Sequence, residues 1–159
     1  MIQRVQSLFL AGVVVLLAVS MFFPVWQKLD SGNESGAVLR VTHTEILTPG
    51  QEKQLQYFPT AALGILLVIG IVIAAAEIIQ YRNRLNQMKL GAFNSLIIAG
   101  FLGLSVYFSF RMEKMVAVVE EGNYDFGMYL PAAALICNLL ANRFIRKDEA
   151  LVRSVDRIR

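Results

Sequence analysis

A single carboxylate, Glu77, lies inside the apolar run IVIAAAEIIQYRNR at residues 71–84. An ionisable side chain within an apolar segment is a candidate for binding a substrate, an ion or a proton. Glu77 is also only about one helical turn from the polar end of this run, so it can instead pair with Arg4, Arg82 or a neighbouring asparagine. We favour structural pairing for Glu77 over a functional role.

Three asparagines in other apolar segments extend the candidate site around Glu77. Asn94 lies near the start of its segment, and Asn138 and Asn142 are spaced one helical turn apart in the last segment. If the segments that carry Glu77 and Asn94 are antiparallel helices joined by a short link, these two side chains lie at similar depth. The sequence therefore predicts a polar cluster near one end of a helical bundle, suited to a lipid or small ligand. A transporter would normally place such groups near the middle of the membrane.

The remaining residues with reactive side chains give no catalytic pattern. His43 and Cys137 are the only histidine and cysteine, so there is no Cys/His metal spacing and no intrachain disulfide. The sequence contains no HExxH, GxSxG or phosphate-loop motif. We expect no enzyme activity, no cofactor and no metal, and we interpret His43 and its neighbour Glu45 as polar surface residues.

The elements that position these residues are apolar helices. Hydrophobic residues make up 56% of the 159 residues and charged residues only 17%, which is too little polar surface for a small soluble domain. A bilayer core needs about 20 apolar helical residues, and four stretches qualify, at about 8–27, 58–80, 91–111 and 128–145. We expect one all-α membrane domain over 1–159, with four transmembrane helices in a bundle.

Small residues at helical spacing indicate how the predicted helices pack. Glu77 is expected to share one face with Gly70 and Ala74. The third segment carries small residues every four positions, namely Gly91, Ser95, Ala99 and Gly103. Such a stripe favours close backbone approach, so we expect the third helix to be the central packing helix. Bulk at Ala99 should then overpack the contact, whereas Leu102→Ile should be nearly silent.

The links and the tail have their own patterns. Gly, Asn and Ser residues begin the link 28–57, and its β-branched run VLRVTHTEIL precedes a Thr-Pro-Gly turn. This pattern predicts a small extracytoplasmic β-hairpin between the first two helices. The tail 146–159 places Leu151, Val155 and Ile158 on one stripe, which predicts an amphipathic cytoplasmic helix.

The distribution of basic residues indicates orientation. The link 81–90 contains two arginines and a lysine but no acid, so the positive-inside rule places it in the cytoplasm. Both termini then lie on the same side, and the links 28–57 and 112–127 face outward. Because the bases lie at segment ends and form no single stripe, we expect no nucleic acid partner.

The end sequences MIQRVQSLFL and DEALVRSVDRIR resemble those of an uncharacterised bacterial family of small four-helix integral membrane proteins, a domain of unknown function that spans essentially the whole chain. The resemblance implies a multi-pass protein of the bacterial inner membrane. It implies no activity and no site residues.

Two functions follow as hypotheses. The first is a noncatalytic membrane subunit or scaffold, whose partners are the lipid bilayer and other membrane protein subunits. The second is a small carrier or binder of a lipid or small ligand that uses the polar cluster around Glu77.

Overall fold

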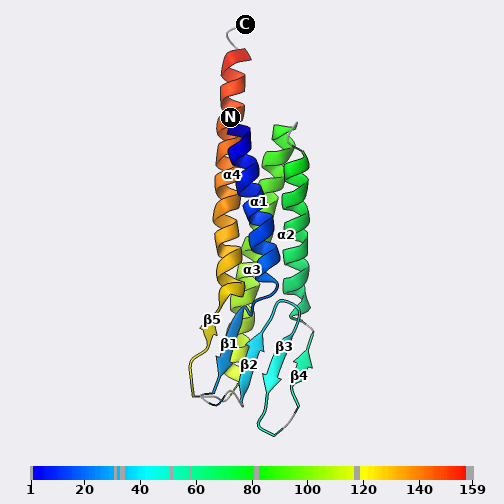
Figure 1. Cartoon of the computed structure of the whole chain (residues 1–159), viewed down its shortest axis with the longest axis vertical. Helices are drawn as coiled ribbons and strands as arrows, with labels where there is room; N and C mark the ends of the chain where they lie inside the picture. The colour runs from blue at the N-terminus through cyan, green and yellow to red at the C-terminus, as the bar shows by residue number, and fades with distance from the viewer. Residues whose placement is uncertain are drawn as a thin grey trace.

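Four helices run side by side, with a small sheet at one end of them (Figure 1). This computed structural model describes residues 2–30, 32, 35–50, 52–57, 59–80, 83–116 and 119–156, and within these ranges the side chains from 5 to 152. The helices are α1 (Ile2–Ser20), α2 (Ala61–Ile79), α3 (Arg84–Met115) and α4 (Phe126–Asp156). Because α1 and α3 each pack mainly against α2 and α4, no helix is central, contrary to the role expected for the third.

Three helices are long and apolar enough to cross a membrane, over Ala61–Ile79, Arg84–Met115 and Phe126–Val152. The apolar part of α1, Val5–Ser20, is shorter. The first segment was expected to continue as a helix to residue 27, and this boundary is wrong: α1 ends at Ser20 and a strand begins at Trp26. Pro24 disfavours a helical conformation of the residue before it, which is consistent with this earlier end.

The two links at the far end of the helices form one five-stranded antiparallel sheet, so the predicted hairpin is only part of it. The strand order is β4-β3-β2-β1-β5. The strands are β1 (Trp26–Leu29), β2 (Gly36–Leu39), β3 (Thr44–Leu47), β4 (Gln54–Gln56) and β5 (Asn123–Tyr124). β5 comes from the second link and pairs with β1. The Nζ atom of Lys28 in β1 also lies 2.6 Å from Oε1 of Glu113 in α3.

The tail continues α4 and is no separate helix. Helix α4 is unbroken through Asp156, and Figure 1 shows it extending past the ends of the other three helices. Arg84 at the start of α3 forms an ion pair with Asp148 of α4, with Nη1 2.7 Å from Oδ2. The position of Ile158, predicted on the apolar stripe, is outside the described residues.

The small-residue stripe of α3 turns away from its neighbours along the helix. Gly91 is buried, whereas Ala99 and Gly103 are exposed, and a Cβ added at Gly103 would meet nothing within 4 Å. On a helix of 3.6 residues per turn, each four-residue step rotates the position by about 40° around the axis. Residues spaced four apart therefore move progressively away from the face of α3 that packs against the other helices. Because Ala99 is exposed, Ala99→Leu is not expected to overpack a helix contact. Leu102, which lies off the stripe, packs against the core instead.

Candidate functional site

The polar residues predicted to cluster are buried between the helices. Glu77, Asn94 and Asn138 are 0% exposed and Asn142 is 3% exposed. Two glutamines are also buried: Gln6 of α1, which the sequence places at the same end of the bundle, and Gln87 of α3, for which the sequence gives no such indication. All four helices thus contribute to one set, which we call the polar core: Gln6, Glu77, Gln87, Asn94, Asn138 and Asn142.

Asn138 links α4 to α3 through two hydrogen bonds. Its Nδ2 donates to the carbonyl oxygen of Gly91 at 2.8 Å and to Oγ of Ser95 at 2.9 Å. The hydroxyl of Ser95 in turn donates to the Gly91 carbonyl. The amide of Asn142 occupies the space where a Cβ of residue 91 would lie. A glycine at 91 and a small hydroxyl at 95 therefore let two amides of α4 reach the α3 backbone.

Glu77 is held by its backbone, while its carboxylate has no partner in the part of the chain that the structure describes. Its carbonyl oxygen accepts a hydrogen bond from Nε2 of Gln87 at 3.0 Å. Both carboxylate oxygens are buried and unpaired. Of the partners expected for Glu77, the Arg4 side chain and Arg82 are outside the described residues, and the three buried asparagines do not bond to it.

Asn94 does not lie at the depth of Glu77, contrary to expectation. A Cβ added at Gly70 would lie 3.4 Å from Asn94 Oδ1, whereas Glu77 lies opposite Gln87. Gly70 and Glu77 are about 10 Å apart along the axis of α2. Gly70, Ala74 and Glu77 all lie on the buried face of α2, so the polar core is an elongated column rather than a compact ring.

Several oxygens in this column lack a donor. Within the polar core, both carboxylate oxygens of Glu77 and the Oδ1 atoms of Asn94, Asn138 and Asn142 have no hydrogen-bond partner among the described residues, and neither do the amide nitrogens of Gln6 and Asn94. Leaving a buried polar group unpaired costs about 1–3 kcal/mol, and more for a charged group. Oxygen ligands suit hard cations. No group of three or more His, Cys, Asp or Glu that could hold a metal occurs in the described ranges.

An apolar layer separates the polar core from the sheet. Ile98 and Phe101 follow Asn94 along α3, and Leu17 of α1 and Leu67 of α2 face the same interior. Each of these side chains is at most 1% exposed. The polar core therefore lies in the part of the bundle remote from the sheet, beginning near the ends of α2 and α3.

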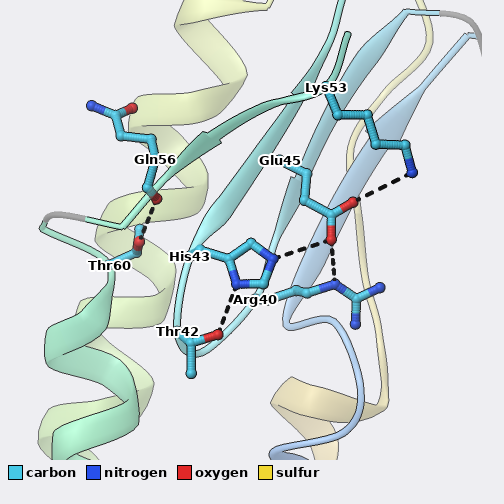
Figure 2. A network of polar contacts seen from close by, with 7 residues as sticks. All are labelled: Arg40, Thr42, His43, Glu45, Lys53, Gln56 and Thr60. Atoms are coloured by element: carbon cyan, nitrogen blue, oxygen red, sulfur yellow. Dashed lines mark hydrogen bonds and ion pairs between the residues drawn. The ribbon is translucent and has the colours of Figure 1, made fainter.

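A second polar network lies on the sheet, where the sequence indicated only surface residues. Three side chains converge on Glu45 of β3 (Figure 2): Arg40 Nε at 2.7 Å, His43 Nε2 at 3.3 Å and Lys53 Nζ at 3.9 Å. Burial raises the pKa of Glu45, but hydrogen bonds from Arg40 and His43 and the charges of Arg40 and Lys53 outweigh it. The pKa of this carboxyl is consequently lowered from its ordinary value of 4.5.

This lowered pKa makes stability depend on pH. The ionised form of Glu45 stabilises the folded chain fully above its unfolded pKa, and we expect that stabilisation to be lost as the pH falls through the folded pKa. Unfolding midpoints followed into acid should therefore drop more in the wild type than in Glu45→Gln. Equal acid sensitivity of the two proteins would show that the network does not stabilise the fold.

Comparison with known proteins assigns the chain to a family. The model of the family described as "Domain of unknown function (DUF4293)" matches residues 2–158. This match confirms the expected membership of a family of unknown function. No curated protein matches the chain.

Proposed function

Since this chain belongs to the DUF4293 family, whose function is unknown, we propose a function from its site: a noncatalytic integral membrane protein that binds a small monovalent cation in the polar core. One observation carries the proposal, namely the fully buried Glu77 carboxylate, which has no partner among the described residues. An ionised group in such surroundings is strongly disfavoured unless a positive charge compensates it.

The charge of the polar core favours a monovalent ion. Glu77 is its only ionisable side chain, and the amide oxygens of Asn94, Asn138 and Asn142 are neutral. One sodium ion balances one carboxylate, whereas a divalent ion would leave a buried positive charge. Neutral amide oxygens are ordinary ligands for a hard cation. Asn142 packs against Gly91, one helical turn after Gln87, so its amide is closer to the Glu77 end of the column than Asn94 is.

The apolar layer supports binding rather than conduction through the chain. Ile98 and Phe101 fill the interior beyond Asn94, and a charge crossing this layer would have no polar contact. Retention of sodium by the purified protein, and its loss in Glu77→Gln, is the result expected. Unchanged retention of sodium by Glu77→Gln would show that Glu77 does not bind the ion.

A second candidate function, the membrane subunit, is favoured by the end of α4. This helix continues past the other three (Figure 1), and Leu151 and Val152 on it are 49% and 43% exposed. An apolar surface on a protruding helix is suited to contact with another protein. If this is its role, purification in mild detergent should retain a partner that is lost in the double variant Leu151→Glu/Val152→Glu. A clean monomer from wild-type cells would contradict it.

The proposed location is the bacterial inner membrane, with several spans and both termini in the cytoplasm. Ten lysines and arginines then lie on the inner side and four in the outer links, with Arg111 at a boundary. In a background that lacks Cys137, a cysteine at Ser35 should react with an impermeant thiol reagent in intact cells, and one at Asn86 should not. The reverse labelling pattern would overturn this orientation.

A further inference from the structure

A cavity of about 310 Å³ lies between the sheet and the end of α3 nearest to it. Three aromatic side chains line it: Trp26 of β1, Tyr124 of β5 and Phe110 of α3. The lining also contains two carboxylates, Glu113 of α3 and Glu121 of the segment before β5, and no lysine or arginine of the described part of the chain. Its volume is at the lower end of the range of about 300–1,000 Å³ for small-molecule sites. The cavity therefore combines aromatic surface with acidic groups.

Contacts between the sheet and α3 fix two of the aromatic rings. Trp26 and Tyr124 are direct partners across β1 and β5, so their side chains lie on the same face of the sheet. The phenol oxygen of Tyr124 lies 2.8 Å from Oγ of Ser109 in α3. The Ser109 hydroxyl donates to the carbonyl oxygen of Val106, so the phenol is the donor to Ser109. This bond holds the Tyr124 ring beside α3.

The exposed part of the cavity is formed by the other side chains. Trp26 is only 2% exposed and forms the floor, whereas Tyr124 and Phe110 are 36% and 63% exposed. A Cβ at Gly122 would overlap the Trp26 indole. A glycine therefore lets the chain cross the indole at this point, and the preceding residue, Glu121, lies exposed at the rim. Two aromatic rings and one carboxylate are thus open to a ligand.

One of the two carboxylates lacks a positive partner. Glu113 is neutralised by Lys28 of β1, whose Nζ lies 2.6 Å from its Oε1 and whose side chain is only 7% exposed. The Glu121 side chain forms no ion pair within the part of the chain that the structure describes. The cavity therefore carries one uncompensated negative charge.

We infer that this cavity binds the ammonium group of a small organic cation. Aromatic rings attract such a cation electrostatically, and quaternary ammonium groups are commonly bound between aromatic side chains. The charge of Glu121 adds to this attraction. A metal ion would need more oxygen ligands, and the hydroxyls of Ser109 and Tyr124 are already bonded to each other. The cavity is at the sheet end of the helices and Glu77 is remote from it, so the inference is independent of the proposed sodium site.

The test compares two ligands of the same shape and different charge, choline and its neutral isostere 3,3-dimethylbutan-1-ol. Trp26 is the only tryptophan, so its fluorescence in the purified chain, in a detergent without ammonium groups, reports on the cavity. Choline should bind at least about fivefold more tightly than the alcohol, equivalent to about 1 kcal/mol. Equal binding of the two would overturn the inference, as would no binding of choline in this titration and in equilibrium dialysis with radioactive choline.

Two variants separate the carboxylate from the ring. Glu121→Gln removes the charge, and Phe110→Leu keeps an apolar side chain but removes the aromatic face. Each should lower the affinity for choline at least about fivefold and leave that for the alcohol nearly unchanged. The matched controls are Glu52→Gln, at an exposed acid on the link 28–57, and Phe93→Leu, at a 53% exposed ring near the other end of α3. Both controls should bind choline as the wild type does, and equal losses in controls and variants would contradict the site.

An ammonium group can reach the cavity from solution or on a lipid headgroup. Phosphatidylcholine that displaces choline, when phosphatidylglycerol with the same acyl chains does not, would identify the headgroup as the ligand. If neither lipid displaces choline, the ligand is a free cation. Equal displacement by both lipids would overturn the inference, because phosphatidylglycerol carries no ammonium group and the cavity would then bind acyl chains.

Discussion

Gly91→Ala is expected to lower the free energy of unfolding by about 1–3 kcal/mol, the usual penalty for overpacking a tight contact. The added Cβ would overlap the side-chain amide of Asn142. Asn142 is only 3% exposed, so its side chain has little room to move away. Displacing α4 would also lengthen the hydrogen bond from Asn138 to the Gly91 carbonyl. The thermal or denaturant unfolding of the purified protein in detergent measures the loss.

Gly103→Ala is the matched control for this prediction. It makes the same chemical change on the same helix, but nothing lies within 4 Å of the added Cβ. Alanine favours the helix over glycine by about 1 kcal/mol, so this variant should be as stable as the wild type or more stable. Equal destabilisation by both substitutions would mean that the contact between α3 and α4 at Gly91 is wrong.

The helices could be predicted from the sequence because their signal is local. Apolar runs such as ALGILLVIGIVIAAA in α2 have no conformation in lipid other than a helix. The packing face of α3 could not be predicted in the same way. Its four-residue stripe from Gly91 to Gly103 is regular in sequence, but the buried face follows Asn94, Ile98, Phe101 and Ser105, at the alternating spacings of four and three that 3.6 residues per turn require.

In the sheet, pairing between neighbouring strands could be predicted in part, but pairing between strands far apart in the sequence could not. The β3–β4 hairpin could be predicted because the β-branched run and the Thr-Pro-Gly turn after it are contiguous. The turn at residues 40–43, which divides the run VLRVTHTEIL into β2 and β3, was not predicted. The pairing of β1 with β5 joins residues from two separate links, with Trp26 opposite Tyr124. β5 has only two residues, which is too short for a periodic signal. Pairing between strands of separate links depends on how the helices bring the links together, so it cannot be predicted from a local sequence pattern.

The candidate site was predictable in its residue types and not in its contacts. Buried polar side chains on apolar helices already indicate an interior cluster, as for Asn138 and Asn142. Which groups pair depends on the relative shift of neighbouring helices, which places Gln87 opposite Glu77 and Asn94 opposite Gly70. The convergence of Arg40, His43 and Lys53 on Glu45 likewise depends on strand register.

Loss of sodium binding in Glu77→Gln is the second large effect expected. The substitution keeps the size of the side chain and removes its charge, so the ion would lose its only anionic ligand in a buried site. We expect sodium affinity to fall by at least about tenfold, equivalent to about 1.4 kcal/mol of binding free energy. Glu52→Gln, which neutralises an exposed acid on the link 28–57, should leave the affinity unchanged and so controls for the loss of one negative charge.

Equilibrium dialysis with radioactive sodium, on the purified chain in detergent with choline as the competing salt, tests the Glu77 site most directly. The predicted result is about one sodium ion retained per chain by the wild type and by Glu52→Gln, because one buried carboxylate supplies the charge, and loss of that retention in Glu77→Gln. Equal retention by the wild type and Glu77→Gln, or no retention by any of the three proteins, would contradict a cation site in the polar core.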